Sequence, residues 1–220
     1  MIHQTNSPPP IIGVLALQGA YDAHAKALTS LGAIARLVRV PEGLEGLDGL
    51  IMPGGESTTM LKFLERGSFF ETLAAFVKQT PTFGTCAGAI LLATHVEHPT
   101  QRSLCALDIT VERNAYGRQN DSAILTEETN LPGGPLEMVY IRAPRITRTG
   151  PEVETLATRD NFPTLVRQKH ILAATFHPEL ATDTRVHQLF LNIVRSRRLE
   201  LEVSRSDAAD GASGMAPCKN

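Results

Sequence analysis

The chain has 220 residues, enough for one domain with a substantial core, and its 42% hydrophobic and 20% charged residues are typical of a globular protein. A formal net charge of -2 and the absence of tryptophan argue against surfaces that bind nucleic acids or anionic membranes. Its three cysteines are scattered and form no CxxC pair, which predicts neither a disulfide framework nor a zinc site. No segment resembles a signal peptide or a membrane span, so we expect a protein of the reducing cytoplasm.

The first 96 residues alternate between strand and helix patterns. Residues 1–10 are polar and proline-rich and predict a loose lead-in, followed by one domain over 11–199. The continuous apolar run at 11–17 is typical of a strand buried on both faces. Further strands are expected at 34–40, 47–55 and 81–85, and helices at 20–33, 57–66, 69–80 and 87–96. This alternation predicts an α/β domain of three layers, with a mostly parallel central sheet flanked by helices.

Beyond residue 105, the pattern changes to short apolar runs separated by turn residues. These runs predict an antiparallel or mixed extension of the same sheet. They lie at 106–114, 135–144, 152–160, 162–168 and 169–179. A last helix is expected over 182–198, and residues 200–220 have the small, polar composition of a disordered tail.

The pentapeptide GTCAG at 84–88 joins a predicted strand to a predicted helix. It fits the G-x-nucleophile-x-G pattern of a nucleophile elbow, with Cys86 as the nucleophile. Glycine on both sides tolerates a close approach of the backbone, and the N-terminus of the following helix favours a thiolate. The alternative is a packing role, because free cysteines are among the most buried residues. By itself, the pentapeptide favours packing.

A thiol nucleophile needs a base, and the base needs an orienting group. Of the seven histidines, His177 follows an apolar strand, where an α/β sheet presents its active-site loops. Glu179 is two residues further on and can fix the tautomer of the ring. The histidines inside predicted helices, His24 and His187, are interpreted as surface or packing residues. Cys86, His177 and Glu179 are therefore candidates for a catalytic triad.

A second glycine-rich turn follows the strand predicted at 47–55. Gly54 and Gly55 end this strand, and Glu56 precedes the predicted helix with its Ser/Thr cap. Backbone N–H groups at such a turn can stabilise an oxyanion, although a tight turn alone also calls for glycine. The lysine of a phosphate-binding loop is missing after the glycines, which disfavours phosphate binding.

Six segments, in order, resemble class I glutamine amidotransferases, and in particular the glutaminase subunits of pyridoxal 5'-phosphate synthases. The segments are GVLALQGAYDAH (13–24), DGLIMPGGESTTM (48–60), FGTCAG (83–88), VERNAYGRQNDS (111–122), YIRAP (140–144) and FHPEL (176–180). They are far more specific than the elbow alone. The resemblance therefore reverses the packing interpretation of Cys86 and implies the flavodoxin-like fold of this family.

The resemblance implies hydrolysis of L-glutamine to L-glutamate and ammonia, without a cofactor or metal. Cys86 would attack the side-chain amide, with His177 as the base and Glu179 as its orienting group. Backbone N–H groups of Gly55 and Ala87 would hold the oxyanion. Arg113 would bind the α-carboxylate of glutamine, because its guanidinium suits a bidentate partner. The substrate-binding residues implied are Gly54, Gly55, Glu56, Arg113, Ile141 and Arg142.

The family passes its ammonia to a (β/α)8-barrel synthase subunit, so the resemblance implies a hetero-oligomeric complex that makes pyridoxal 5'-phosphate, a form of vitamin B6. Gln18 would support the oxyanion site near the interface with that partner. Nothing implies a nucleic acid or membrane partner.

Two alternatives remain beside this interpretation. The chain could be a glutaminase for another synthase or a peptidase-like hydrolase with the same elbow, against which the segment at 111–122 argues. It could also be a non-catalytic regulatory subunit with this fold, against which the intact triad argues.

Overall fold

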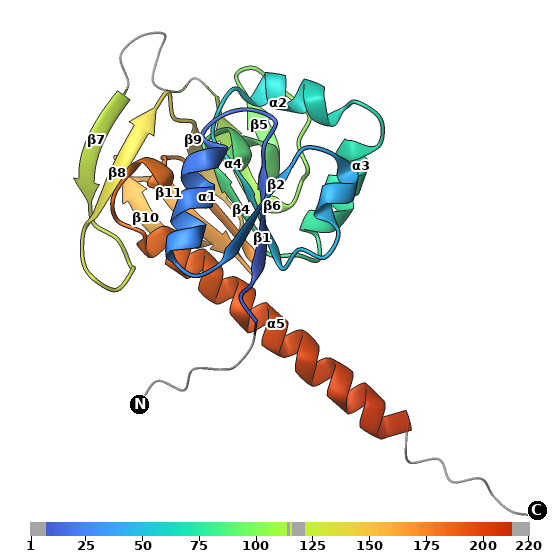
Figure 1. Ribbon diagram of the computed structural model, residues 1–220. Helices are drawn as coiled ribbons and strands as arrows, with labels where there is room; N and C mark the ends of the chain where they lie inside the picture. The colour runs from blue at the N-terminus through green and yellow to red at the C-terminus, as the bar shows by residue number, and fades with distance from the viewer. Residues whose placement is uncertain (1–7, 114, 116–121, 213–220) are drawn as a thin grey trace, which may run out of the picture.

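A seven-stranded sheet forms the centre of the molecule and carries helices on both faces (Figure 1). The computed structural model describes residues 8–113, 115 and 122–212. Its strands are β1 (Ile11–Leu15), β2 (Ile34–Val38), β3 (Gly49–Met52), β4 (Thr82–Thr85), β5 (Ala93–Glu97), β6 (Leu107–Glu112), β7 (Ser122–Glu127), β8 (Leu136–Ile141), β9 (Arg145–Thr149), β10 (Glu154–Arg159), β11 (Phe162–Gln168) and β12 (Ile171–Ala174). Its α-helices are α1 (Tyr21–Ser30), α2 (Ser57–Leu64), α3 (Phe69–Val77), α4 (Ala87–Leu92) and α5 (Arg185–Ala212), with single 3-10 turns η1 (Pro41–Leu44) and η2 (Pro178–Leu180).

The central sheet has the strand order β10-β11-β12-β4-β3-β1-β2. Strands β12, β4, β3, β1 and β2 are parallel, whereas β11 runs antiparallel to β12 and β10 antiparallel to β11. The prediction of a mostly parallel sheet flanked by helices is confirmed. Because the strand order reverses between β1 and β3, the carboxyl ends of the strands border a crevice where α/β folds bind their ligands.

Two hydrophobic cores cover opposite faces of this sheet, because side chains alternate along each strand. Leu50 and Met52 of β3 pack with α2, α3 and α4, while Ile51 packs on the other face with α1 and α5. β12 alternates in the same way, with Ala173 in the first core and Leu172 in the second. Both faces of the central strands are therefore buried, which leaves the strand ends for function.

The second half of the chain extends the central sheet only in part. β10, β11 and β12 join it, as expected, but β5, β6 and β9 form a separate three-stranded sheet and β7 and β8 form a hairpin. In β8, the buried residues Leu136, Met138 and Tyr140 alternate with residues that are more exposed. One face of the hairpin thus packs on the core and the other faces solvent, so the hairpin is stabilised without joining the central sheet.

The helix predicted at 87–96 is too long. α4 ends at Leu92, and Ala93, with an extended ψ of 149°, begins β5. β5 pairs in parallel with β6, and Val96 lies opposite Val111. The apolar pattern suits either element, but the β-branched Thr94 and Val96 favour a strand once β6 offers its hydrogen bonds.

The sequence predicts that the domain ends at residue 199 and that a disordered tail begins at residue 200. In the structure, α5 continues past this point and ends at Ala212. Three alanines and two glutamates, residues of high helix propensity, lie between residues 200 and 212. Leu199, Leu201 and Val203 are exposed, and this end of the helix projects from the body (Figure 1).

Residues 1–7 of the predicted lead-in and 213–220 of the tail lie outside the described residues. Within the described part of the chain, every helix is too short or too polar to cross a membrane.

Candidate active site

The predicted site residues come from loops at the carboxyl ends of neighbouring parallel strands. Gln18 follows β1, Gly54 and Gly55 follow β3, Cys86 follows β4 and His177 follows β12. Since β12, β4, β3 and β1 are adjacent, these loops meet at the edge of the sheet that the strand order marks for ligand binding.

Cys86 occupies a strained turn between β4 and α4. Its backbone angles are φ 48° and ψ -103°, in the left-handed region that costs a non-glycine residue about 1–3 kcal/mol. Its N–H donates to the carbonyl of Ala174 at 2.8 Å, which ties the turn to β12. The glycines of the elbow are sterically required: a Cβ on Gly84 would lie 2.6 Å from the backbone of Gly88, and one on Gly88 would lie 2.0 Å from the carbonyl oxygen of Met52. The sequence argument for these glycines is confirmed.

His177 is held in place by its backbone and by Glu179. Its N–H donates to the carbonyl of Val139 in β8 at 2.8 Å. Its ring Nδ1 lies 2.8 Å from Oε1 of Glu179, as expected for a base and its orienting carboxylate. Nε2 is buried and makes no hydrogen bond of ordinary geometry with the described residues, so it remains available to the sulfur of Cys86 and to a substrate.

The charges of this group favour an imidazolium beside the nucleophile. Burial alone lowers the pKa of His177, but its interactions with Cys86 and with the Glu179 carboxylate outweigh burial and raise this pKa to about 10. Burial raises the pKa of Glu179, but the hydrogen bond to His177 and the neighbouring rings of His24 and His177 bring it below its usual value. A ring that holds its proton firmly and a carboxylate that stays ionised suit proton transfer from a thiol.

Gly54 lies close to both His177 and Cys86. A Cβ at this position would lie 2.3 Å from Cε1 and 2.9 Å from Nδ1 of His177, and 3.2 Å from Cβ of Cys86. The close approach therefore requires glycine. Gly55 has a φ of +150°, and a Cβ there would lie 2.5 Å from Nε2 of Gln18. Nε2 of Gln18 donates to the backbone carbonyl of Glu56 at 2.7 Å, and this hydrogen bond stabilises the turn that contains Gly54 and Gly55.

A pocket of about 130 Å³ opens beside these groups. The residues from the sequence prediction that line it are Gly55, Glu56, Cys86, Arg113, Ile141, Arg142 and His177. Gln18, Gly54, Ala87 and Glu179 do not line the pocket; Ala87 is fully buried and begins α4. The structure thus brings most of the predicted residues to one cavity, and each of the other four adjoins a residue that lines it.

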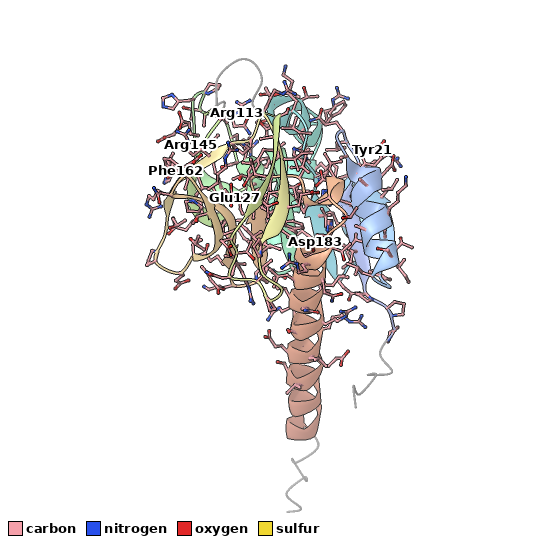
Figure 2. The ribbon with its side chains drawn as sticks, turned by 90° about the vertical axis from the view of Figure 1, so that its left-hand side faces the viewer. Tyr21, Arg113, Glu127, Arg145, Phe162 and Asp183 are labelled. Carbon is pink, nitrogen blue, oxygen red and sulfur yellow. The ribbon has the colours of Figure 1, made fainter. Side chains whose placement is uncertain are left out.

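Arg113 reaches the pocket from the end of β6, and Figure 2 shows it at the end of the body opposite the projecting helix. Its Nη2 donates to Oγ1 of Thr58 at 2.9 Å and lies 3.5 Å from Oε1 of Glu56. Glu56 caps α2, a role that the sequence prediction gave to a serine or threonine, by accepting from the N–H groups of Thr58 at 3.1 Å and Thr59 at 2.6 Å. Slight burial raises the pKa of Glu56, but these hydrogen bonds lower it to about 2. One guanidinium and one carboxylate therefore face the pocket as an ion pair.

Sequence reasoning missed several residues of the site. Ser57, Ile90 and Pro144 also line the pocket, and Ser57 and Pro144 belong to segments that carried the family resemblance. His24 and His187, interpreted as surface or packing residues, are both buried; His24 contacts Glu179, and His187 contacts His24. The segment at 111–122 lies largely outside the described residues, which omit 114 and 116–121. Within the described ranges, no group of three or more His, Cys, Asp or Glu side chains is arranged to hold a metal ion.

The chain is similar to known proteins over most of its length. Residues 14–196 match the SNO glutamine amidotransferase family. A relative from Koribacter versatilis, named pyridoxal 5'-phosphate synthase subunit PdxT, is 62% identical over 84% of this chain and 96% of the relative. The protein of the same name from Corynebacterium jeikeium is 50% identical over 86% of this chain and 100% of its own length. A crystal structure of a glutamine amidotransferase, 45% identical, superposes with a TM-score of 0.76 over 83% of this chain and 98% of that chain. This likeness bears out the expected fold.

Proposed function

Because the chain belongs to the SNO glutamine amidotransferase family, we propose that it is the glutaminase subunit of a pyridoxal 5'-phosphate synthase and acts in vitamin B6 biosynthesis. It hydrolyses L-glutamine to L-glutamate and ammonia. The relatives named PdxT, which align over nearly their whole length, support this activity. The structural observation that carries it is the meeting of Cys86, on its strained elbow, with the His177–Glu179 pair at one pocket.

In the proposed mechanism, His177 takes the proton of the Cys86 thiol, and the sulfur attacks the side-chain carbonyl carbon of glutamine. A tetrahedral intermediate forms, and its oxyanion is held by backbone N–H groups of Gly55 and Ala87. His177 then gives its proton to the leaving ammonia, and a thioester remains on Cys86. The raised pKa of His177 supports its role as the acid that protonates this leaving group.

Water completes the reaction. His177 takes a proton from a water molecule, the hydroxide attacks the thioester, and glutamate leaves as the Cys86 sulfur is released. Glu179 remains ionised throughout and stabilises the imidazolium that forms in each half of the reaction. Its buried position, 2.8 Å from Nδ1, suits this role.

Substrate binding is assigned to the pocket wall. Arg113, a partly buried guanidinium whose Nη2 is oriented by Thr58, binds the α-carboxylate of glutamine. Glu56 is ionised and beside it, so the pair matches the opposite charges of an α-amino acid. Gly55 and the backbone near Ile141 and Arg142 complete the pocket, and Gly54 contributes through its close approach to His177 and Cys86.

The proposed partner is a (β/α)8-barrel synthase subunit, which receives the ammonia in a hetero-oligomeric complex. The relatives are named as subunits of a synthase, which supports a partner of this kind. Gln18, at the turn behind Gly55, is the residue through which docking would act on the oxyanion site. We also propose a cytoplasmic location, since Cys86 and Cys105 are free thiols.

The proposal is tested by measuring ammonia release from L-glutamine with and without an added barrel synthase, for the wild type and for Cys86→Ala. We expect release that needs the synthase and disappears in the variant. Release that an unrelated synthase activates instead would reassign the partner. A Cys86→Ala variant as active as the wild type, with the synthase present, would indicate a regulatory subunit.

A further inference from the structure

Two buried histidines continue the line of polar groups behind Glu179. His24 lies in α1 and His187 in α5, and both are fully buried. Nε2 of His24 lies 3.3 Å from Oε2 of Glu179, the carboxylate oxygen that does not contact His177. Nδ1 of His24 lies 2.9 Å from Nε2 of His187. Elements from both ends of the chain thus meet at the carboxylate that orients the base.

Both rings are neutral at ordinary pH. Burial lowers the pKa of His24 to about 4 and that of His187 to about 3. The groups that face His24 are Glu179, His187 and the hydroxyl of Thr85, whose Oγ1 lies 3.2 Å from Nε2, and His177 lies beyond Glu179. Each ring therefore carries one N–H, and the contacts decide which nitrogen holds it.

One tautomer satisfies the contacts. With its proton on Nε2, His24 presents a donor to the oxygens of Glu179 and Thr85, and its Nδ1 accepts from Nε2–H of His187. Nδ1 of His187, which is buried without a partner among the described residues, is then only an unused acceptor. With the proton of His24 on Nδ1, a lone pair would face the carboxylate and a buried N–H of His187 would have no acceptor, which is the costlier arrangement.

We propose that His24 is a positioning residue of the glutaminase reaction: its Nε2–H holds the second oxygen of Glu179, and His187 fixes the tautomer of His24. This inference rests on the function proposed above. Oε2 of Glu179 is buried and makes no hydrogen bond of ordinary geometry with the described residues, and Nε2 of His24 lies 3.3 Å from it, so this contact is the one that can anchor the oxygen. Contacts with Nε2 of His24 on one oxygen and with Nδ1 of His177 on the other restrict the rotation of the carboxylate, which in turn orients the imidazole of His177.

Substitutions at His24 separate this role from packing. Gln places an amide nitrogen at the position of Nε2, Asn places one at the position of Nδ1, and Leu offers no donor. We expect His24→Leu and His24→Asn to lower kcat of the synthase complex about 10- to 100-fold, with KM for glutamine changed less than about 2-fold. His24→Gln is expected to stay within about 3-fold of wild-type kcat.

Phe83→Leu is the matched control, because Phe83 packs edge-on against both rings, with centroids 6.3 Å from His24 and 6.1 Å from His187, and offers no hydrogen bond. We expect this control to keep kcat within about 3-fold of the wild type. The positioning role is overturned if His24→Gln is as slow as His24→Leu, if Phe83→Leu is equally slow, or if the loss appears in KM alone. Should His24→Leu fail to fold, the contrast between Gln and Asn decides.

A second measurement needs no activity. Long-range ¹H–¹⁵N spectra of the ¹⁵N-histidine-labelled subunit, assigned with His24→Gln, report the tautomer of His24. We expect the Nε2–H tautomer, and an Nδ1–H tautomer would overturn the inference. If the wild-type complex releases no ammonia, the proposed function fails, while the spectra still decide whether His24 donates to Glu179.

Discussion

Gly54→Ala is the substitution whose effect follows most directly from the geometry of the site. The added Cβ would lie 2.3 Å from Cε1 of His177 and 3.2 Å from Cβ of Cys86. Carbon atoms in contact are normally about 3.5–4.0 Å apart, so the imidazole must retreat by more than about 1 Å. A displacement of about 1 Å at reacting groups costs about 100-fold in rate, and we expect that loss in kcat.

The assay is ammonia release at saturating glutamine with the barrel synthase present. Gly46→Ala is the matched control: Gly46 has a φ of +68° and nothing within 4 Å of its Cβ position, so alanine there strains the backbone without touching the site. We expect this control to lose about 1 kcal/mol of unfolding free energy and to keep its activity. If Gly54→Ala retained more than half of the wild-type kcat, the inferred contact of the turn with the base would be wrong.

Two further predictions concern substrate binding and pH. Arg113→Lys is expected to raise KM for glutamine about 10-fold with little change in kcat, because an ammonium cannot replace the bidentate guanidinium. Initial rates over a range of glutamine concentrations measure both constants. An unchanged KM would contradict the assignment of Arg113 to the α-carboxylate. Because burial lowers the pKa of His24 and His187 from 6.5 to about 4 and about 3, the unfolded chain takes up protons first as the pH falls below 6.5. The free energy of unfolding should therefore decrease from pH 6.5 to 4 in urea titrations, and less steeply in the double variant His24→Gln, His187→Gln; equal slopes would show that these rings do not titrate as inferred.

Much of the fold and the site could be predicted because their signals are local. The strands at 11–17 and 81–85 are continuous apolar runs, as buried parallel strands must be, and the loops that follow them carry glycines that only a close approach explains. Cys86, His177 and Gly54 could be selected without knowing the strand order, since each follows its own strand.

The remainder depends on contacts between distant parts of the chain. β5 forms because β6 pairs with it, and the hairpin of β7 and β8 is placed by the core that its apolar face covers. His24 and His187 are 163 residues apart, and each sits in an ordinary helical pattern. Nothing local distinguishes such histidines from packing residues, so their link to Glu179 emerges only when α1 and α5 meet on one face of the sheet.

Cys86 and His177 both follow strands of the central sheet, but their backbones are held by different strands. The backbone N–H of Cys86 donates to Ala174 of β12, in the central sheet, whereas the backbone N–H of His177 donates to Val139 of β8, in the hairpin. β8 ends at Ile141, which lines the pocket. The same hairpin strand therefore holds the backbone of His177 and contributes to the pocket wall. We therefore expect a displacement of the hairpin, by a substrate or by a docked protein, to move the backbone of His177 more than that of Cys86.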